Sequence, residues 1–228
     1  MSTVKDEAIK LRKNIDIVYE AGRKDGQSEF WDKYQNNGNQ TNYARAFAGV
    51  CWRDETYNPK YNMRPTNAQD MFRYSLITDP YKNGIEIDFS QCTNFTNTFD
   101  GCSIPRLGVI DIRGITGGNA YAFASANIVT IEKMIINDDG STDFPATMFT
   151  SCTNLTNISF EGVIGKDLNL SGSRKLSYDS LINIITVLKD YSEDTSGTTH
   201  KITLGATNLA KLTEEEKAIM DTKGWTYA

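Results

Sequence analysis

Histidine and cysteine are scarce in this sequence. One histidine, His200, and four cysteines occur among 228 residues, and no two cysteines show the Cys-x-x-Cys spacing of zinc and redox sites. We therefore expect no metal centre, no cofactor and no thiol–imidazole pair. Cys51, Cys92, Cys102 and Cys152 are predicted to be free and buried, because free cysteine packs as a small hydrophobe.

Long apolar runs and a surplus of positive charge are also missing. No run approaches the ~20 apolar residues that a membrane span needs, and charges are spread through residues 1–20, so we also expect no signal peptide. The 24 basic and 29 acidic residues give a net charge of −5, which disfavours nucleic-acid binding. An apolar content of 39% suffices for a buried core, so we expect a soluble, folded protein.

What the sequence does contain is a phenylalanine that recurs at a near-constant interval. Phe72, Phe99, Phe123 and Phe149 are each followed three residues later by a small residue, either Ser, Cys or Ala. Each is also followed by a short strand-type run, and these runs lie at 85–89, 109–113, 133–137 and 158–162. One strand in every ~25 residues predicts stacked coils that share one interior. We expect the four rings to form the spine of that interior.

The repeat resembles a known class. The run DFSQCTNFTNTFDGC at 88–102, followed by VIDIR at 109–113, is similar to the BspA-type leucine-rich repeat of bacterial surface proteins and of phages and prophages of Gram-positive hosts. Residues 30–61 and 203–228 resemble the flanks of phage-borne members. The resemblance implies an α+β solenoid, an irregular BspA-like leucine-rich repeat with parallel strands, an N-terminal helix and an α/β C-terminal cap.

The repeat and its flanks divide the sequence into four segments. We predict an N-terminal amphipathic or coiled-coil helix at 1–29, an N-terminal cap at 30–66, the repeat body at 67–175 and a C-terminal cap at 176–228. In the first segment, spacings of four and three residues place five apolar residues on one stripe. Self-association through this stripe and packing on the same chain both remain open. The stripe contains Val4, Ala8, Leu11, Ile15 and Val18.

Both caps carry their own signals. Residues 43–49 are predicted to form a short helix that covers the first coil. In the C-terminal cap, a helix is predicted around Leu181, Ile184, Ile185 and Leu188, and a strand at 201–205. Thr213 and Glu216 have the spacing of a capping box, which predicts a last helix that ends at Gly224 and is followed by a closing strand.

Candidate binding residues are the positions of the strand runs that the repeat leaves exposed. Alternation along the strands could bring carboxylates and an arginine onto one face, but a solvated polar surface explains them better than an acid–base pair. We expect His200 to be a solvent-facing loop residue, and 137–143 to be a turn rather than a calcium loop. The candidates are Glu86, Asp88, Asp111, Arg113, Asn137, Ser159 and Glu161.

The resemblance implies a non-enzymatic structural or host-surface-binding protein of a phage virion, made in the host cytoplasm. It would serve as a tail fibre, a baseplate part or a capsid decoration. Expected partners are other virion proteins and a second copy of the chain through the N-terminal helix, and a glycan or protein of the host surface through the repeat body. The alternatives are a bacterial cell-surface adhesin and a glycan-cleaving tail enzyme.

Overall fold

The computed structural model describes residues 42, 44–48, 62–76 and 86–228. Contacts divide the chain into two units, 1–40 and 41–228, and the second contains every described residue. The predicted N-terminal helix with Val4, Ala8, Leu11, Ile15 and Val18 lies outside the described residues, as do Cys51 and most of the predicted N-terminal cap.

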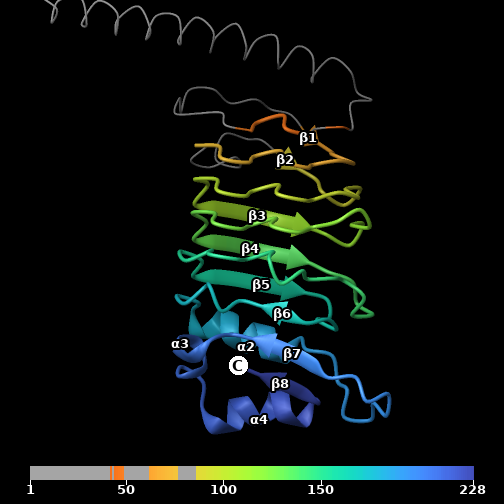
Figure 1. The fold of residues 1–228 in the computed structure, drawn as a ribbon, viewed down its shortest axis with the longest axis vertical. Coiled ribbons are helices and arrows are strands. Elements are labelled where there is room, and N and C mark those ends of the chain that lie inside the picture. Colours follow the sequence, from red (N-terminus) through yellow and green to blue (C-terminus); the bar gives the residue numbers. More distant parts are fainter. Residues whose placement is uncertain (1–41, 43, 49–61, 77–85) are drawn as a thin grey trace, which may run out of the picture. The chain divides into compact units, whose positions relative to one another are not determined.

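The described residues form a mixed α/β structure whose paired strands are all parallel (Figure 1). A two-stranded pair, β1-β2, is followed by two three-stranded sheets in the orders β3-β4-β5 and β6-β7-β8. The parallel strands and the mixture of strands with C-terminal helices were predicted and are confirmed. The strands are β1 (Asn62–Met63), β2 (Glu86–Ile87), β3 (Arg106–Asp111), β4 (Thr130–Ile135), β5 (Asn157–Glu161), β6 (Leu168–Asn169), β7 (His200–Thr203) and β8 (Trp225–Tyr227). The helices are α2 (Tyr178–Thr186), α3 (Ala206–Leu209) and α4 (Glu214–Thr222).

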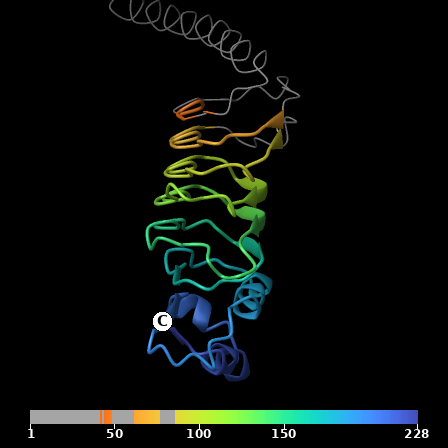
Figure 2. The ribbon, with the colours of Figure 1, turned by 90° about the vertical axis from the view of Figure 1, so that its right-hand side faces the viewer.

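Each passage of the chain adds one layer to the body. Arg106 of β3 pairs with Thr130 of β4, which in turn pairs with Asn157 of β5. Each of these strands buries apolar side chains against the interior, for example Ile110, Met134 and Phe160. Figure 2 shows the strands on one side of these layers and tight turns on the opposite side.

Phenylalanine rings form a continuous stack between the turns and the sheet. The ring centroids of Phe47 and Phe72 are 4.9 Å apart, those of Phe72 and Phe99 5.2 Å, those of Phe99 and Phe123 5.6 Å, and those of Phe123 and Phe149 5.1 Å. No pair of planes is more than 9° from parallel, and every ring is buried. The predicted spine of four rings is therefore confirmed, with Phe47 as a fifth member.

The helix predicted at 43–49 is wrong for its described part, because residues 44–48 form a turn. The backbone N–H groups of this turn donate to the next layer rather than along a helix. Arg45 N donates to the carbonyl of Gln69 at 2.9 Å, and Phe47 N donates to that of Met71 at 2.7 Å. The Phe47 turn therefore repeats the turns below it.

Left-handed backbone recurs in these turns. Eight residues that lie two positions before or after a stacked phenylalanine have φ values between 52° and 62°, whereas Thr147, two positions before Phe149, does not. This conformation costs a non-glycine residue about 1–2 kcal/mol, and bonds to the neighbouring layer offset the cost. Within one turn, for example, Phe72 N donates to Thr98 O at 2.7 Å and Tyr74 N to Asp100 O at 2.8 Å. The left-handed residues are Arg45, Asp70, Asn97 and Tyr121 before the ring, and Tyr74, Gly101, Ser125 and Ser151 after it.

Two predicted strands are displaced from the observed ones. The runs 109–113 and 133–137 were predicted, whereas β3 and β4 begin and end earlier, at 106–111 and 130–135. The apolar pattern continues past each strand because Ile112 and Ile136 are buried in the bend that follows. A prediction from the hydrophobic pattern alone therefore counts the bend after each strand as part of the strand.

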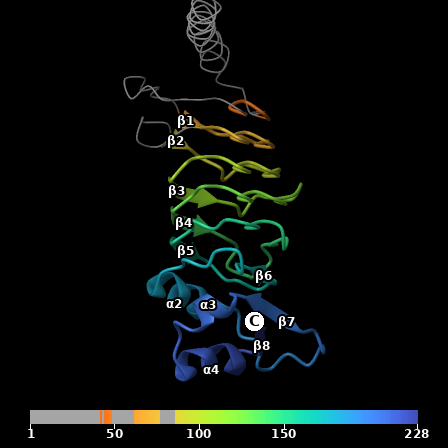
Figure 3. The same ribbon diagram turned by 60° about the vertical axis from the view of Figure 1, so that its left-hand side comes forward.

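Of the three C-terminal helices (Figure 3), α2 and α4 follow their sequence signals, whereas α3 was not predicted. The Ser177 hydroxyl caps α2, which buries Leu181, Ile184 and Ile185, and Leu188 is buried beyond the end of the helix. The predicted capping box is confirmed, since Thr213 and Glu216 each bond the backbone N–H of the other at the start of α4. The strand predicted at 201–205 is β7, observed at 200–203, and the closing strand is β8.

Candidate functional site

The outer side of the β3-β4-β5 sheet, here called the strand face, carries ion pairs that run between adjacent strands. Arg106 of β3 pairs with Glu132 of β4, and Lys133 of β4 pairs with Glu161 of β5. All four side chains are about half exposed. Such pairs contribute about 0–1 kcal/mol each, so the strand face is a polar surface whose charges largely satisfy one another.

A shallow groove of about 580 Å³ crosses the upper part of this face, next to β2. Its walls include Asp88 after β2, Arg106 and Val109 of β3, and Glu132 of β4. Ile87, Phe89 and Ile135 also line the groove. It therefore combines apolar side chains, among them the 47% exposed Val109, with charged ones. Such a lining can contact a small ligand that carries both apolar and polar groups.

Asp111 was predicted to be exposed, and this is wrong: the residue is 7% exposed. Its carboxylate accepts hydrogen bonds from Arg113, at 3.1 Å from the backbone N and 2.7 Å from Nη2. This hydrogen bond raises the pKa of Arg113. Arg113 itself lies beyond the end of β3 and is exposed. The pair closes a turn and does not present two free charges.

Asp88 also follows its strand and serves its own turn. Its Oδ1 accepts from the backbone N of Ser90 at 3.0 Å, and its Oδ2 lies 3.4 Å from Nε of Arg64. A hydrogen bond with the Ser90 side chain lowers the pKa of Asp88, with smaller contributions from the Ser90 backbone N–H and from Arg64. The carboxylate is therefore ionised and already bonded.

The other candidates are spread along the strand ends. Asn137 lies beyond β4, and its Nδ2 donates to the carbonyl of Arg113 at 3.5 Å. Ser159 and Glu161 lie on β5, and Glu86 is the first residue of β2. The fold thus brings Asp111, Arg113 and Asn137 together at one corner and joins Glu161 to Lys133. It does not gather all seven candidates into one site.

The turns on the side opposite the sheet carry a second polar network, which the sequence analysis missed. We call this side the turn edge, and define it as residues 45–47, 70–74, 97–101, 121–125 and 149–151. The buried carboxylate of Asp70 accepts from Asn97 Nδ2 at 2.9 Å and from Arg73 Nη1 at 3.2 Å, and it lies 3.4 Å from Arg45 Nε. Arg73 also donates Nε to Asp100 at 3.0 Å. These bonds link successive layers.

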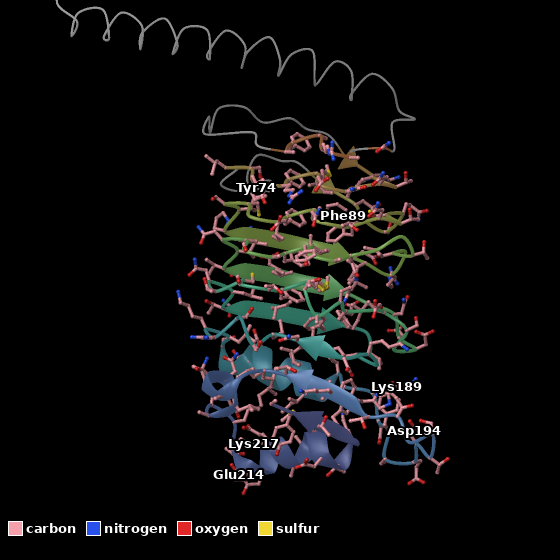
Figure 4. The ribbon with its side chains drawn as sticks, in the orientation of Figure 1. Tyr74, Phe89, Lys189, Asp194, Glu214 and Lys217 are labelled. Atoms are coloured by element: carbon pink, nitrogen blue, oxygen red, sulfur yellow. The ribbon has the colours of Figure 1, made fainter. Side chains whose placement is uncertain are left out.

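Two tyrosines project from the turn edge. Tyr74 is 58% exposed and Tyr121 is 47% exposed, and both have left-handed backbone. Tyr74 and Phe89 are both labelled in Figure 4, and of the two only Phe89 is buried. The signal that could have found Tyr74 is its alignment with Gly101 two residues after the repeated phenylalanine, where a large side chain is out of place.

The described cysteines are free and buried, as predicted. Burial raises the pKa of Cys92 to about 11 and those of Cys102 and Cys152 to about 12 each. These thiols are therefore protonated near neutral pH and lack the thiolate that a nucleophile needs.

His200 is not the solvent-facing loop residue that was predicted. It opens β7, and its ring stacks on that of Tyr191 with a centroid separation of 3.5 Å and an angle of 5° between planes. Nε2 of His200 lies 3.5 Å from Oδ2 of Asp194. The side chain is 13% exposed and belongs to an aromatic cluster with Trp225.

A second shallow groove lies between α2 and α4, with a volume of about 500 Å³. Tyr178 and Ile219 project into it, and the Tyr178 hydroxyl bonds Glu216. Among the described residues, no group of three His, Cys, Asp or Glu side chains is arranged to hold a metal ion. No helix within the described ranges is long and apolar enough to span a membrane.

Comparison of the chain with protein-family models, with curated proteins and with solved structures finds no match.

Proposed function

We propose that the layered part of the chain is a solenoid of BspA-like leucine-rich repeats. Three observations support this: parallel pairing of successive layers, a buried phenylalanine in the same place in each turn, and left-handed residues at matching offsets from it. In such an architecture each layer buries its apolar side only against its neighbours.

We further propose that the protein is a non-enzymatic structural or host-surface-binding component of a phage particle. The phage setting rests on the resemblance of the repeat and its flanks. The binding role rests on one observation above others: the five stacked rings from Phe47 to Phe149 hold a rigid series of layers. A rigid surface binds with little loss of conformational entropy.

The chemistry of the described side chains agrees with this role. The charges of the strand face pair with one another, and the described thiols are buried with raised pKa values. In this proposal the N-terminal residues attach the protein to other virion proteins and to further copies of the chain, and the repeat body contacts the host surface.

Mass spectrometry of purified particles tests the proposal. Particles released from the strain that carries the gene should contain the protein in a fixed ratio to the capsid protein. Recovery from the cell wall and not from particles would instead favour the adhesin. A glycan-release assay on host cell wall provides the second readout, because catalytic turnover by the purified protein would contradict a non-enzymatic role.

A further inference from the structure

The turn edge carries two exposed aromatic side chains at a conformational cost. Tyr74 and Tyr121 both have left-handed backbone, with φ values of 55° and 57°. Tyrosine gains nothing from this conformation, which glycine and asparagine adopt more easily. At the corresponding place after the ring, the next layers have Gly101, Ser125 and Ser151. A large, exposed side chain at such a position is not required by the fold.

Tyr74 is held in place rather than free to rotate. Its ring lies against Gly101, where an added Cβ would come within 2.6 Å of ring carbon Cε1. Arg73 contacts the same tyrosine in two ways. Its guanidinium carbon lies 4.9 Å from the centroid of the Tyr74 ring, and its Nη2 donates to the Tyr74 hydroxyl at 3.3 Å. Asp70 and Asp100 in turn fix Arg73. The fold therefore presents a preorganised aromatic platform.

Tyr121 continues the same edge. It occupies the place before the ring that Asp70 and Asn97 occupy in the two layers above it. Because each layer adds about 4.8 Å, the turns of Tyr74 and Tyr121 are about 10 Å apart along the stack. The polar side chains of Asp70, Asn97 and Asp100 belong to two of the layers that these turns cover, the layer of Tyr74 and the one that follows it.

We propose that this edge binds a neutral oligosaccharide, with Tyr74 and Tyr121 as stacking platforms and the polar side chains as partners for sugar hydroxyls. A pyranose ring offers an apolar C–H face and a rim of hydroxyl groups, which suits an aromatic ring flanked by charged donors and acceptors. The inference rests on the proposed binding function and names the class of its ligand.

Charge and surface character favour a neutral glycan over other partners. Arg45 and Arg73 balance Asp70 and Asp100, so the network adds no net charge that would select an anionic ligand. Arg73, held by Asp70 and Asp100, adjoins Tyr74, whereas protein interfaces are typically centred on a contiguous apolar patch.

An array of purified oligosaccharides tests the proposal with the full chain. The array includes neutral probes such as chitohexaose and cellohexaose, and sialylated and phosphorylated glycans for contrast. We expect retention of at least one neutral probe, and a loss of roughly tenfold or more in affinity for Tyr74→Asn and Tyr121→Asn. Asparagine removes the ring and tolerates the left-handed backbone, so circular dichroism should show both variants folded. Tyr178→Asn, which alters a tyrosine 48% exposed on α2, should bind like the parent.

A measurement on the parent protein makes the test independent of the variants. On titration with the retained probe, the ring-proton NMR signals of Tyr74 and Tyr121 should shift. Retention of no neutral probe, equal binding by both turn-edge variants, or unshifted ring signals would each overturn the proposal. Binding only to a host protein would also overturn it. Presence or absence in phage particles does not enter this assay, so the two proposals fail separately.

Discussion

The rings of Phe72 and Phe99 lie parallel, with 5.2 Å between centroids and 3° between planes, although a full layer of chain separates them. Phe99 is enclosed on both sides, because Phe123 stacks on its other face at 5.6 Å. The interior of the body is therefore continuous from one layer to the next. Rings in the middle of the stack, such as Phe99, should contribute most to the stability of the fold.

Phe99→Ala should lower the free energy of unfolding by about 3–5 kcal/mol, because it removes a buried ring and leaves a cavity between two others. Urea unfolding monitored by circular dichroism measures the change. Phe99→Leu keeps most of the volume and should cost clearly less. A cost below 1 kcal/mol for the alanine variant would contradict a continuous core.

Gly101→Ala should destabilise the protein through two separate effects. The left-handed backbone, with φ of 62°, costs alanine about 1–2 kcal/mol, and overlap with the Tyr74 ring adds about 1–3 kcal/mol. Gly197 provides the control, since it has φ of 77° and nothing within 4 Å of an added Cβ. Gly197→Ala should therefore show the first effect alone.

A double-mutant cycle in urea separates the Tyr74 contact further. In a Tyr74→Asn background, Gly101→Ala should cost no more than Gly197→Ala. An unchanged cost in that background would show that the ring does not rest on Gly101.

Arg113→Ala should destabilise the protein more than Arg106→Ala, because it leaves the buried carboxylate of Asp111 with fewer donors. Arg106→Ala removes only a half-exposed ion pair and should cost no more than about 1 kcal/mol. Thermal unfolding of the two variants tests the order. Equal effects would mean that Asp111 does not depend on Arg113.

Stability should fall in alkali as the unfolded chain loses thiol protons. Cys102 and Cys152 have folded pKa values of about 12, against about 8.5 for an exposed thiol. Between these values the folded state holds protons that the unfolded state releases, so the free energy of unfolding decreases with rising pH, by up to about 1.4 kcal/mol per pH unit for each thiol.

The double variant Cys102→Ala/Cys152→Ala isolates this effect from tyrosine and lysine titration. Urea unfolding at pH 8 and pH 10 should show a smaller difference for the variant than for the parent. An identical difference would mean that the thiols are ionised in the folded protein.

Self-association through the N-terminal stripe is one of the two predictions for this segment, and packing on the same chain is the other. Light scattering tests self-association, which should give more chains per particle for the full chain than for a shortened chain that begins at Phe30. Leu11→Asp, which places a charge on the stripe, should have the same effect as the truncation. The same number of chains in all three proteins would exclude assembly through this segment.

Much of the architecture followed from local signals in the sequence. The interval between Phe72, Phe99, Phe123 and Phe149 was sufficient to predict the ring stack, and the capping box at Thr213 was sufficient to predict the start of α4. Strand ends were less predictable, because Ile112 and Ile136 are buried in the bends that follow the strands and not within the strands themselves.

The candidate surface depended far more on tertiary structure. Asp111 alternates along its run as an exposed residue would, yet its arginine neighbour folds back and buries it. His200 lies after a polar loop in sequence, yet it stacks on Tyr191. Neither outcome is encoded in spacing, because each depends on the direction in which a neighbouring side chain turns.

The sequence by itself determined the layered plan of the body, since a buried ring at a fixed interval has few other ways to leave water. Tertiary structure alone decided which polar groups face outward and which pair with one another. It also placed Tyr74 on Gly101, because only stacking brings residues one layer apart in sequence into contact. The interval between the phenylalanines can be read from the sequence, whereas contacts between residues of adjacent layers are known only from the folded structure.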